Sequence, residues 1–478
     1  MKQSEKQFEK ISGRKIGALG MGRSGLAAAL LGKRLGAEVF VSDSKSTEDA
    51  GAALEILKSA GVECETGGHT DRILESDYVV ISPGVSADST IVEKLQQQGT
   101  PVFSELEFAS WVNQGRMIAV TGSNGKTTTA TMIDYILRAE NYKTFLCGNV
   151  GQPFSGCAAD IPSDGVAVVE VSSYQLEFVD QFRPDVALIT NVTPDHLERH
   201  GSMKQYRETK LRITSSQTEK DTLVLNIESP ELDARSIQTR ARTLFFGKKE
   251  TLSTCGVGES GQAVFLREGV IFGNFGQTEV KLFARAELRV PGAHNVENAM
   301  AAASAALAFG VSPDSIRSGL LSFPGVEHRL EFVTEIDGVR LINDSKATNL
   351  DATISALQAT DGAVGLILGG RGKGEDFAVL GQSVAGKVGH IMALGESKEL
   401  IFEALGKITP VEFADSMTHA LSRLLDLSGA GETILLSPGC ASFDMYRNFE
   451  ERGAAFKEAA HSLAKKAGHK NKAGAVEN

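Results

Sequence analysis

The sequence predicts an α/β protein of three domains: a Rossmann-like N-terminal domain, a P-loop-type central domain, and a Rossmann-like C-terminal domain. Three observations give this prediction. Apolar strands alternate with helical patterns at both ends of the chain, which is typical of parallel sheets covered by helices. A glycine-rich turn between a strand and a helix occurs twice, near residues 20 and 122. Finally, 478 residues exceed what one hydrophobic core usually contains.

The N-terminal domain is expected over residues 1–105. Its pattern is strand, glycine-rich turn, Ala/Leu-rich helix, strand, helix and strand, which predicts one small doubly wound unit. The predicted elements are strands at 15–19, 38–43 and 78–84, and helices at 26–36 and 52–61.

The central domain is expected over residues 106–324. It begins with the strand MIAVT at 117–121, a second glycine-rich turn and a helix, and the next strands are apolar runs typical of burial on both faces. Short β-like runs between residues 222 and 288 predict extra strands beside this sheet, and a helix follows at 295–310. Pro324 and Gly325 are turn formers, so we place a boundary there.

The C-terminal domain is expected over residues 325–478, where the alternation resumes. Strands are predicted at 339–344, 363–370, 390–395 and 433–439, and helices at 350–358 and 445–464.

Bulk properties restrict the functional class. A composition of 42% hydrophobic and 23% charged residues is that of a folded protein, and a net charge of -11 argues against nucleic acid or an anionic membrane as partner. The N-terminus has no apolar leader segment, and no stretch is long enough to span a bilayer. The scattered cysteines form no C-x-x-C pair, so we expect a cytoplasmic protein without a disulfide framework or a zinc site: Cys64, Cys147, Cys157, Cys255, Cys440.

The second glycine-rich turn carries the sharpest motif, TGSNGKTT at 121–128. Backbone N–H groups at such a turn bind phosphate oxygens, Lys126 adds a positive charge, and the Thr127 hydroxyl is a ligand for Mg²⁺. The strict phosphate-loop pattern would place its first glycine at Val120, so the match is incomplete. The flanking strand and helix nevertheless lie where phosphate binding requires them, and nucleotide binding is predicted.

Three further residues are candidates for chemistry. Glu170 ends the valine-rich strand after the turn, where burial without a partner would be costly, so a cation is the favoured partner. His196 follows a later strand and is either a metal ligand, a general base or a structural residue. Lys210 lies in a predicted helix, and its spacing alone indicates an ordinary solvated lysine.

The first glycine-rich turn, GMGRSG at 20–25, is followed by Asp43 at the end of the second strand. This pattern matches the dinucleotide fingerprint and suggests a nicotinamide-dependent dehydrogenase as one alternative. The same geometry holds any nucleotide diphosphate, and hydride transfer has no use for a separate phosphate loop with lysine and threonine.

With the phosphate loop, Glu170, His196 and Lys210 in this order, the chain resembles the Mur ligases, a family that adds amino acids to UDP-N-acetylmuramoyl precursors. The resemblance covers nearly the whole chain. The motifs NDSKATN at 343–349, GGRGKGEDF at 369–377 and LSPGCASFD at 436–444 are similar to those of the members that add D-glutamate.

The resemblance implies an ATP-dependent amide-bond ligase of peptidoglycan precursor synthesis, with a central ATPase domain. Its substrates would be the small molecules UDP-N-acetylmuramoyl-L-alanine and D-glutamate, joined through an acyl phosphate with release of ADP and phosphate. Its cofactors would be two Mg²⁺ ions and a CO₂-derived carbamate on Lys210. A monomer that binds neither nucleic acid nor membrane is expected.

The resemblance also implies roles for individual residues. Contacts to the UDP-substrate are implied for Gly22, Arg23, Ser24, Asp43, Ser82, Pro83, Gly84, Asn149 and His196. Contacts to ATP are implied for Gly122, Ser123, Asn124, Gly125, Lys126, Thr127, Thr128, Asn295, Asn298, Arg329, Asp344 and Lys346. The D-glutamate pocket would contain Thr348, Lys373, Ser442 and Phe449. The metal ligands would be Thr127, Glu170, His196 and carbamoylated Lys210, and the catalytic residues Lys126, His196 and Lys210.

Two positions depart from the family pattern: Phe443 stands where leucine is expected, and Arg371 where an acidic residue is common. Other members of the same fold remain alternatives, such as the meso-diaminopimelate- or lysine-adding ligases and folylpolyglutamate synthetase, although no D-N-P-R signature occurs. A nucleotide-gated binding or regulatory protein that lost the ligase step is an alternative from another class.

Overall fold

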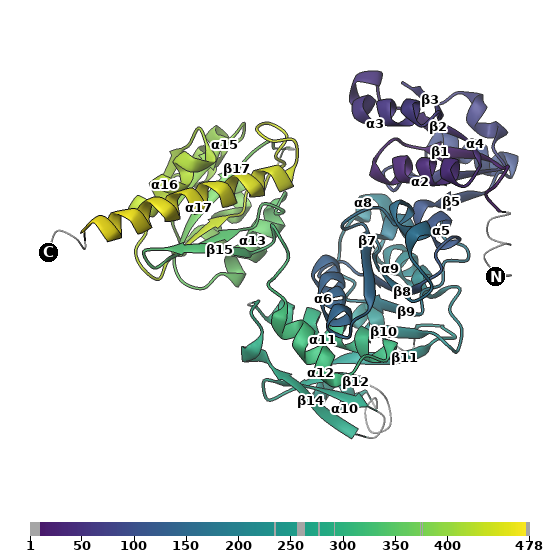
Figure 1. Cartoon of the computed structure of the whole chain (residues 1–478). Helices are drawn as coiled ribbons and strands as arrows, with labels where there is room; N and C mark the ends of the chain where they lie inside the picture. Colours follow the sequence, from purple (N-terminus) through teal and green to yellow (C-terminus); the bar gives the residue numbers. More distant parts are fainter. Residues whose placement is uncertain are drawn as a thin grey trace. The chain divides into compact units, whose positions relative to one another are not determined.

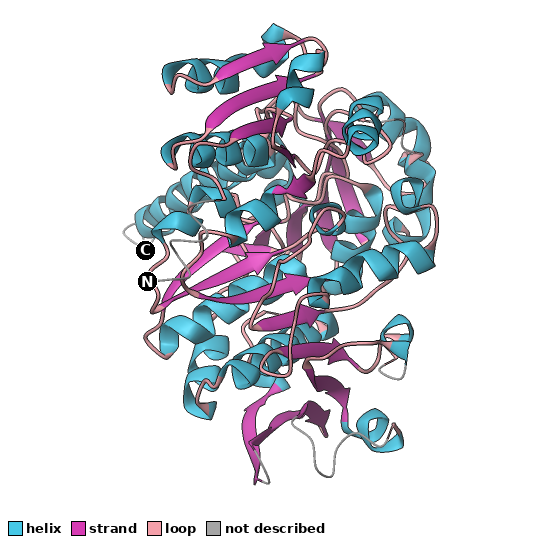
Figure 2. Ribbon diagram, turned by 90° about the vertical axis from the view of Figure 1, so that its right-hand side faces the viewer, coloured by secondary structure: helices cyan, strands magenta, loops and turns pink. Residues whose placement is uncertain are grey.

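The computed structural model describes residues 10–233, 236–255, 263–275, 278–290, 292–372, 374 and 376–474. The chain divides into two compact units, Met1–Phe323 and Pro324–Asn478. The described residues form three β-sheets with helices along their faces, two sheets in the first unit and one in the second (Figures 1 and 2). The α/β class predicted from the sequence is confirmed.

The first sheet is entirely parallel, because each strand is followed by a helical crossover. Its strands in spatial order are β3 (Glu63–Thr66), β2 (Glu38–Asp43), β1 (Lys15–Leu19), β4 (Tyr78–Ile81) and β5 (Val102–Ser104). Its helical segments are α2 (Arg23–Arg34), α3 (Thr47–Ser59), η1 (Asp71–Glu75), α4 (Thr90–Gln98) and α5 (Glu105–Ser110). The strands and helices predicted for this region are present, whereas β3 and β5 were not predicted.

The second sheet is parallel from β7 to β12 and ends in the antiparallel strands β13 and β14. Its strands in spatial order are β14 (Thr278–Ala284), β13 (Val270–Phe275), β12 (Ala263–Arg267), β11 (Arg242–Lys248), β10 (Thr222–Asn226), β9 (Val186–Ile189), β6 (Arg116–Thr121), β8 (Gly165–Glu170) and β7 (Lys143–Gly148). The extra strands expected between residues 222 and 288 are thus confirmed as β10–β14.

The helices of the second sheet include a closely packed group. Helix α11 is alanine-rich and mostly buried, and α12 approaches α6 so closely that a Cβ on Gly319 would lie 2.5 Å from the Cα of Ile136. The α-helices are α6 (Lys126–Ala139), α7 (Ser173–Leu176), α8 (Leu197–His200), α9 (Met203–Leu211), α10 (Lys249–Thr254), α11 (Ala293–Phe309) and α12 (Pro313–Ser322). Short 3-10 segments are η2 (Phe154–Gly156), η3 (Ala158–Asp160), η4 (Arg212–Thr214), η5 (Pro230–Leu232) and η7 (Arg285–Glu287).

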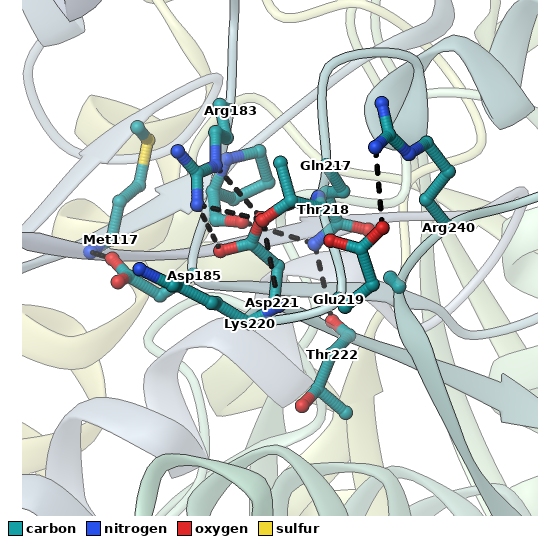
Figure 3. Close-up of polar contacts among 12 residues, drawn as sticks. Met117, Arg183, Asp185, Gln217, Thr218, Glu219, Lys220, Asp221, Thr222 and Arg240 are labelled. Carbon is teal, nitrogen blue, oxygen red and sulfur yellow. Dashed lines mark hydrogen bonds and ion pairs between the residues drawn. The ribbon is translucent and has the colours of Figure 1, made fainter.

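A polar cluster ties together the segments that lead into β9 and β10 (Figure 3). Arg183 donates from Nε to Asp221 Oδ2 (2.7 Å) and from Nη2 to Asp221 Oδ1 (3.1 Å). The backbone N–H of Thr218 also donates to Asp221 Oδ2, at 2.7 Å. Asp185 accepts from the N–H of Met117 at 2.7 Å, which fixes the start of β6. The cluster sets the alignment of the strands whose opposite ends carry the site described below.

The first and second sheets are joined by a buried carboxylate. Glu107, on α5, accepts hydrogen bonds from the backbone N–H groups of Asp180, Gln181 and Phe182 and from Nε1 of Trp111, at 2.7 to 3.1 Å. Four donors compensate for the removal of this charge from water. The segment after α7 is therefore held firmly against the N-terminal sheet.

The third sheet, in the second unit, is parallel except for the edge strand β15. Its strands in spatial order are β15 (Glu331–Ile336), β16 (Val339–Asn343), β20 (Thr433–Leu436), β17 (Val364–Gly369), β18 (Val388–Leu394) and β19 (Val411–Phe413). Its helical segments are α13 (Leu350–Ala359), η8 (Phe377–Leu380), α14 (Gly381–Val384), α15 (Lys398–Leu405), α16 (Met417–Leu427) and α17 (Phe449–Gly474).

The final helix differs from the prediction of 445–464. It begins at Phe449, because the side chain of Asn448 accepts from the N–H of Glu451 at 2.8 Å and caps the first turn. It continues to Gly474, well past the predicted end. Within the described ranges, no helix combines the length and the apolar character that a membrane span needs.

Candidate active site

The predicted phosphate loop connects β6 to α6, and two of its glycines are required by geometry. Gly122 has a φ of 149°, and a Cβ there would lie 1.9 Å from Thr190 Oγ1. Gly125 has a φ of 82°, and its Cβ would lie 2.2 Å from Asn298 Oδ1. Only glycine fits at either position without displacing a neighbour.

The loop is anchored to the segment after β9. The backbone N–H of Asn124 donates to Asn191 Oδ1 at 2.9 Å, and Thr190 Oγ1 donates to the Asn124 carbonyl at 2.6 Å. Ser123 Oγ donates to the Thr193 carbonyl at 2.9 Å. The backbone around the turn is therefore pre-organised rather than loose.

Two lysines meet at one carbonyl of this loop. Lys126 Nζ donates to the carbonyls of Gly122 (2.9 Å) and Ser123 (2.8 Å). Lys210 Nζ, from α9, donates to the same Gly122 carbonyl at 2.8 Å. A phosphate bound at the start of α6 would have both amino groups and the positive end of the helix beside it. Thr127 and Thr128 are buried in the first turn of α6.

Lys210 is not the solvated lysine that its spacing indicated, because its side chain is only 1% exposed. It lies over the ring of Tyr206, 4.4 Å from the centroid. Burial, reinforced by the charge of Lys126, lowers the pKa of Lys210 to about 7. A large fraction of its amine is therefore neutral and nucleophilic near neutral pH. Tyr206 was not identified from the sequence as part of the site. Its position four residues before Lys210 on the same helix could have indicated that the two side chains are in contact.

Glu170 lies next to the loop, because β8 pairs with β6 in a register that sets Glu170 opposite Val120. Its side chain is 1% exposed, and Asn149 Nδ2 donates to its Oε1 at 2.7 Å. Its Oε2 is buried without a hydrogen-bond partner. An orphaned carboxylate oxygen is costly unless a cation completes it, so the position fits a Mg²⁺ ion shared with phosphate oxygens.

The described residues contain no group of three His, Cys, Asp or Glu side chains arranged to hold a metal by themselves. Mg²⁺ commonly takes one or two carboxylates and completes its shell with water and substrate phosphates. Glu170 is a candidate for such a carboxylate.

His196 is the N-cap residue of α8 and has the left-handed backbone conformation, with a φ of 52°. Its side chain is 46% exposed, and its ring nitrogens lie 3.5 Å from Asp195 Oδ2 and 3.6 Å from Glu198 Oε1. One turn later His200 is buried, with Nε2 at 2.9 Å from Ser173 Oγ. Burial lowers the pKa of His200 and so favours its neutral ring, whereas the half-exposed His196 is accessible to a ligand.

Asn295 and Asn298 start α11 beside the phosphate loop. Thr129 Oγ1 donates to Asn298 Oδ1 at 3.4 Å, and Asn298 Nδ2 donates to Asn295 Oδ1 at 3.3 Å. The structure thus brings together, within the first unit, the phosphate loop, Glu170, Lys210 and this asparagine pair.

The N-terminal glycine turn is held by Asp43. Its Oδ2 accepts from the N–H of Met21 at 2.5 Å and its Oδ1 from the N–H of Lys45 at 2.8 Å. Ser82 Oγ donates to the Gly20 carbonyl at 3.2 Å, which brings Ser82, Pro83 and Gly84 to the edge that carries Gly22 and Ser24. Arg23 donates to the Gly151 carbonyl, and so links this edge to the loop that carries Asn149.

The remaining candidates form a group of their own in the second unit. Asp344 accepts from Ser437 Oγ at 2.8 Å and from the N–H of Leu330 at 3.2 Å, and burial raises its pKa to about 7. Lys346 Nζ lies 5.8 Å from the ring centroid of Phe449, and Arg329 is exposed. Ser442 is buried and Thr348 half-buried, whereas Lys373 lies outside the described residues.

Buried residues that the sequence did not single out hold this group in place. The Arg452 guanidinium donates to the Ser345 hydroxyl and carbonyl and to the Cys440 carbonyl, at 2.8 to 3.0 Å. Of the two departures from the family pattern, Arg371 forms an ion pair with Glu396 at 2.9 Å, and Phe443 is 63% exposed.

A glycine phosphate loop, a nearby buried carboxylate and a buried lysine of lowered pKa on an α/β fold are typical of proteins that bind a nucleoside triphosphate. Models of three protein domains match the sequence: the MurD N-terminal domain at residues 15–91, the Mur ligase middle domain at 120–306, and the Mur ligase glutamate ligase domain at 328–440. This chain belongs to the Mur ligase family.

Relatives match over nearly full length. A UDP-N-acetylmuramoylalanine--D-glutamate ligase of Chlorobium limicola is 43% identical over 467 residues, covering 95% of this chain and 99% of its own. Ligases of the same name from Chloroherpeton thalassium and Acidobacterium capsulatum are 40% and 38% identical, covering 95% and 94% of this chain and 99% and 96% of their own.

Solved structures share the fold. The UDP-N-acetylmuramate-alanine ligase MurC of Thermotoga maritima aligns with a TM-score of 0.56 at 20% identity, covering 94% of this chain and all of its own. MurF of the same organism, in complex with ADP, aligns with a TM-score of 0.53 at 19% identity, covering 96% of this chain and 97% of its own. The three-domain fold that the sequence predicted is therefore supported independently of sequence identity.

Proposed function

We propose that this chain joins D-glutamate to UDP-N-acetylmuramoyl-L-alanine, using ATP and releasing ADP and phosphate, as a step of peptidoglycan precursor synthesis. The full-length relatives carry the name of this activity. The structural observation that carries the proposal is the convergence of Lys126 and Lys210 on the Gly122 carbonyl. A binding protein that had lost the ligase step would have no use for a buried lysine with a pKa near 7 beside a phosphate loop.

Each domain has a separate role in the proposal. Residues 1–105 bind the UDP moiety through the Gly22–Ser24 turn and the loop Ser82–Gly84, with Asn149 and His196 completing the contact. Residues 106–324 bind ATP, and residues 325–478 supply Arg329, Asp344 and Lys346 to the nucleotide. Thr348, Lys373, Ser442 and Phe449 bind D-glutamate.

The reaction needs an activated carboxylate. The alanyl carboxylate of the UDP-substrate attacks the γ-phosphorus of ATP, ADP leaves, and the product is an acyl phosphate with phosphate as a good leaving group. The amine of D-glutamate then attacks the acyl carbon, and the tetrahedral adduct collapses with loss of phosphate. Lys126 would stabilise the charge that spreads over the transferring phosphoryl group, and its hydrogen bonds to the Gly122 and Ser123 carbonyls support this role.

Magnesium and a carbamate complete the proposed site. Thr127 and Glu170 would hold one Mg²⁺ ion, and His196 with the carbamate of Lys210 a second. When bound, the cations neutralise phosphate charge and act as Lewis acids. The orphaned Oε2 of Glu170 and the lowered pKa of Lys210 support these assignments. We further propose that the enzyme is a cytoplasmic monomer.

Phosphate release tests the proposed function. Purified protein with Mg-ATP and UDP-N-acetylmuramoyl-L-alanine should release phosphate only when D-glutamate is added, and not with L-glutamate, meso-diaminopimelate or L-lysine. Lys126→Ala should abolish the release. Stimulation by another amino acid would refute the specificity, and absence of release in every mixture would refute the ligase.

A further inference from the structure

We propose that Arg199 is a positioning residue that fixes the loop Ser82–Val85 against α8, the helix that directly follows His196. The inference rests on the proposed function, because it assigns a role within the site for the UDP-substrate. Arg199 lies on α8, three residues after His196, and was not singled out by any sequence motif.

The contacts of Arg199 use both ends of its guanidinium. Nη1 donates to the Pro83 carbonyl at 3.1 Å and Nη2 to the Val85 carbonyl at 3.0 Å. On its other side, Nε and Nη2 donate to the two carboxylate oxygens of Glu177, at 3.0 and 2.6 Å. The side chains of Arg199 and Glu177 are only 16% and 14% exposed, so water screens this pair weakly. The planar fork of arginine makes all four contacts at once, which a lysine cannot do.

The same guanidinium lies on an aromatic ring that also contacts His196. Its Cζ is 4.2 Å from the ring centroid of Tyr174, and the ring centroids of Tyr174 and His196 are 5.0 Å apart. An unbroken chain of contacts therefore runs from Pro83 and Val85 through Arg199 and Tyr174 to His196. Pro83, at one end of this chain, and His196, at the other, were predicted to touch the UDP-substrate.

Glu177 holds Arg199 from a rigid base. It follows α7, whose first turn is closed by a reciprocal pair of hydrogen bonds between Ser172 and Gln175. Arg212 donates to the Glu177 carbonyl at 2.5 Å and to the Val179 carbonyl at 2.9 Å. Arg212 thus supports the same segment without reaching the loop 82–85, and it serves as a matched control.

A loop that is already ordered loses less conformational entropy when substrate binds. Loss of the Arg199 fork should therefore weaken substrate binding more than turnover at saturation, because the substrate can restore the loop geometry once it is bound. Arg199→Lys should raise KM for UDP-N-acetylmuramoyl-L-alanine about tenfold, while KM for ATP changes less than about twofold.

The test compares Arg199→Lys with Arg212→Lys in steady-state kinetics and in amide hydrogen exchange of the full chain. The inference predicts a raised substrate KM and faster exchange over residues 82–86 in Arg199→Lys alone. Equal changes in both variants, or no change in Arg199→Lys, would overturn it. If Arg199→Lys does not fold, Glu177→Gln takes its place, with the same direction of change expected and an unchanged KM overturning the inference.

Failure of the proposed function would look different. A wild-type protein that does not turn over the UDP-substrate refutes that function, whereas the exchange of residues 82–86 still decides the role of Arg199. Added guanidinium ion tests the local role of the arginine side chain in Arg199→Ala. If guanidinium restores the KM for the UDP-substrate to the wild-type value, the role is supported. If this KM is raised and guanidinium does not lower it, the role is contradicted.

Discussion

Removal of carbon dioxide should abolish ligation, and so should replacement of Lys210 by arginine, because each change prevents a carbamate from forming on Lys210. A carbamate forms when the lone pair of a neutral amine adds to the carbon of CO₂ and the nitrogen releases a proton. Lys210 is buried beside the phosphate loop, where its Nζ lies 2.8 Å from the Gly122 carbonyl. Arginine retains the positive charge but stays protonated at all usable pH values, so it cannot react.

The magnitude follows from the pKa. With a pKa of about 7, roughly half of the Lys210 side chains are neutral at pH 7. At the ordinary lysine value of 10.5 only about one in three thousand would be neutral. Burial and the charge of Lys126 thus increase the reactive form roughly a thousandfold. Below pH 7 the neutral fraction falls about tenfold per unit, so carbamate and activity should fall as pH decreases.

The assay is phosphate release in CO₂-free buffer, before and after addition of bicarbonate, between pH 6 and 8. In parallel, ¹³C-labelled bicarbonate should give a carbamate NMR signal in the wild type that is absent from Lys210→Arg. Lys204, on the same helix with an 84% exposed side chain, is the matched control, and Lys204→Arg should behave as the wild type. An active Lys210→Arg, or full activity in CO₂-free buffer, would refute the reasoning.

Three further predictions concern other parts of the molecule. Glu170→Gln keeps the shape of the side chain but removes the charge of the carboxylate whose Oε2 has no hydrogen-bond partner. We expect activity to fall about 100-fold or more while the melting temperature stays unchanged. A dependence of activity on Mg²⁺ identical to that of the wild type would contradict this prediction. Gly125→Ala should weaken ATP binding at least about tenfold in calorimetry, because its Cβ would lie 2.2 Å from Asn298 Oδ1 at a φ of 82°; unchanged affinity would show that the loop tolerates the methyl group. Asp221→Asn should lower the free energy of unfolding by about 2 kcal/mol at pH 7, because it weakens the hydrogen bonds from Arg183 and Thr218 (Figure 3). Glu219→Gln is the control: Glu219 forms an exposed ion pair with Arg240, and its loss should change the free energy of unfolding little. Equal effects of the two substitutions would contradict the stabilising role of the hydrogen bonds to Asp221.

The pH dependence of the Asp221 effect has a defined sign. Burial alone would raise the pKa of Asp221, but the hydrogen bonds from Arg183 and Thr218 outweigh it and lower the pKa. The stabilisation is therefore present above the unfolded-state pKa of about 4 and is lost as pH falls through the lower folded-state value. The difference between wild type and Asp221→Asn should shrink in urea titrations at progressively lower pH.

The parallel strands could be predicted because both of their faces are buried. The run Val166–Val169 is apolar at every position, as a central strand of a covered sheet requires. In contrast, β3 has the sequence ECET and β7 has KTFLCG, and neither shows such a run. These strands are fixed by pairing with β2 and β8, which is a long-range effect that local sequence does not encode.

The phosphate loop could also be predicted from local sequence. Its geometry depends on neighbouring glycine, lysine and threonine residues, which form a short motif. The burial of Lys210 could not be predicted, since the residues around it have the pattern of a solvated helix. Its burial arises from contact with Gly122, 88 residues earlier in the chain. Arg199 likewise acquires its role only from carbonyls more than 110 residues away, at Pro83 and Val85. Resemblance to a family suggested the proposed role of Lys210, and only the folded chain suggested the proposed role of Arg199.

The central claim is that ATP activates the substrate carboxylate before the amine of D-glutamate attacks it. The most direct test uses UDP-N-acetylmuramoyl-L-alanine labelled with ¹⁸O in its alanyl carboxylate, together with D-glutamate and Mg-ATP, and measures the masses of the released phosphate and of the ligated product. The account predicts one ¹⁸O atom in each phosphate and one retained in the new amide. Unlabelled phosphate, or phosphate release without a ligated product, would contradict it.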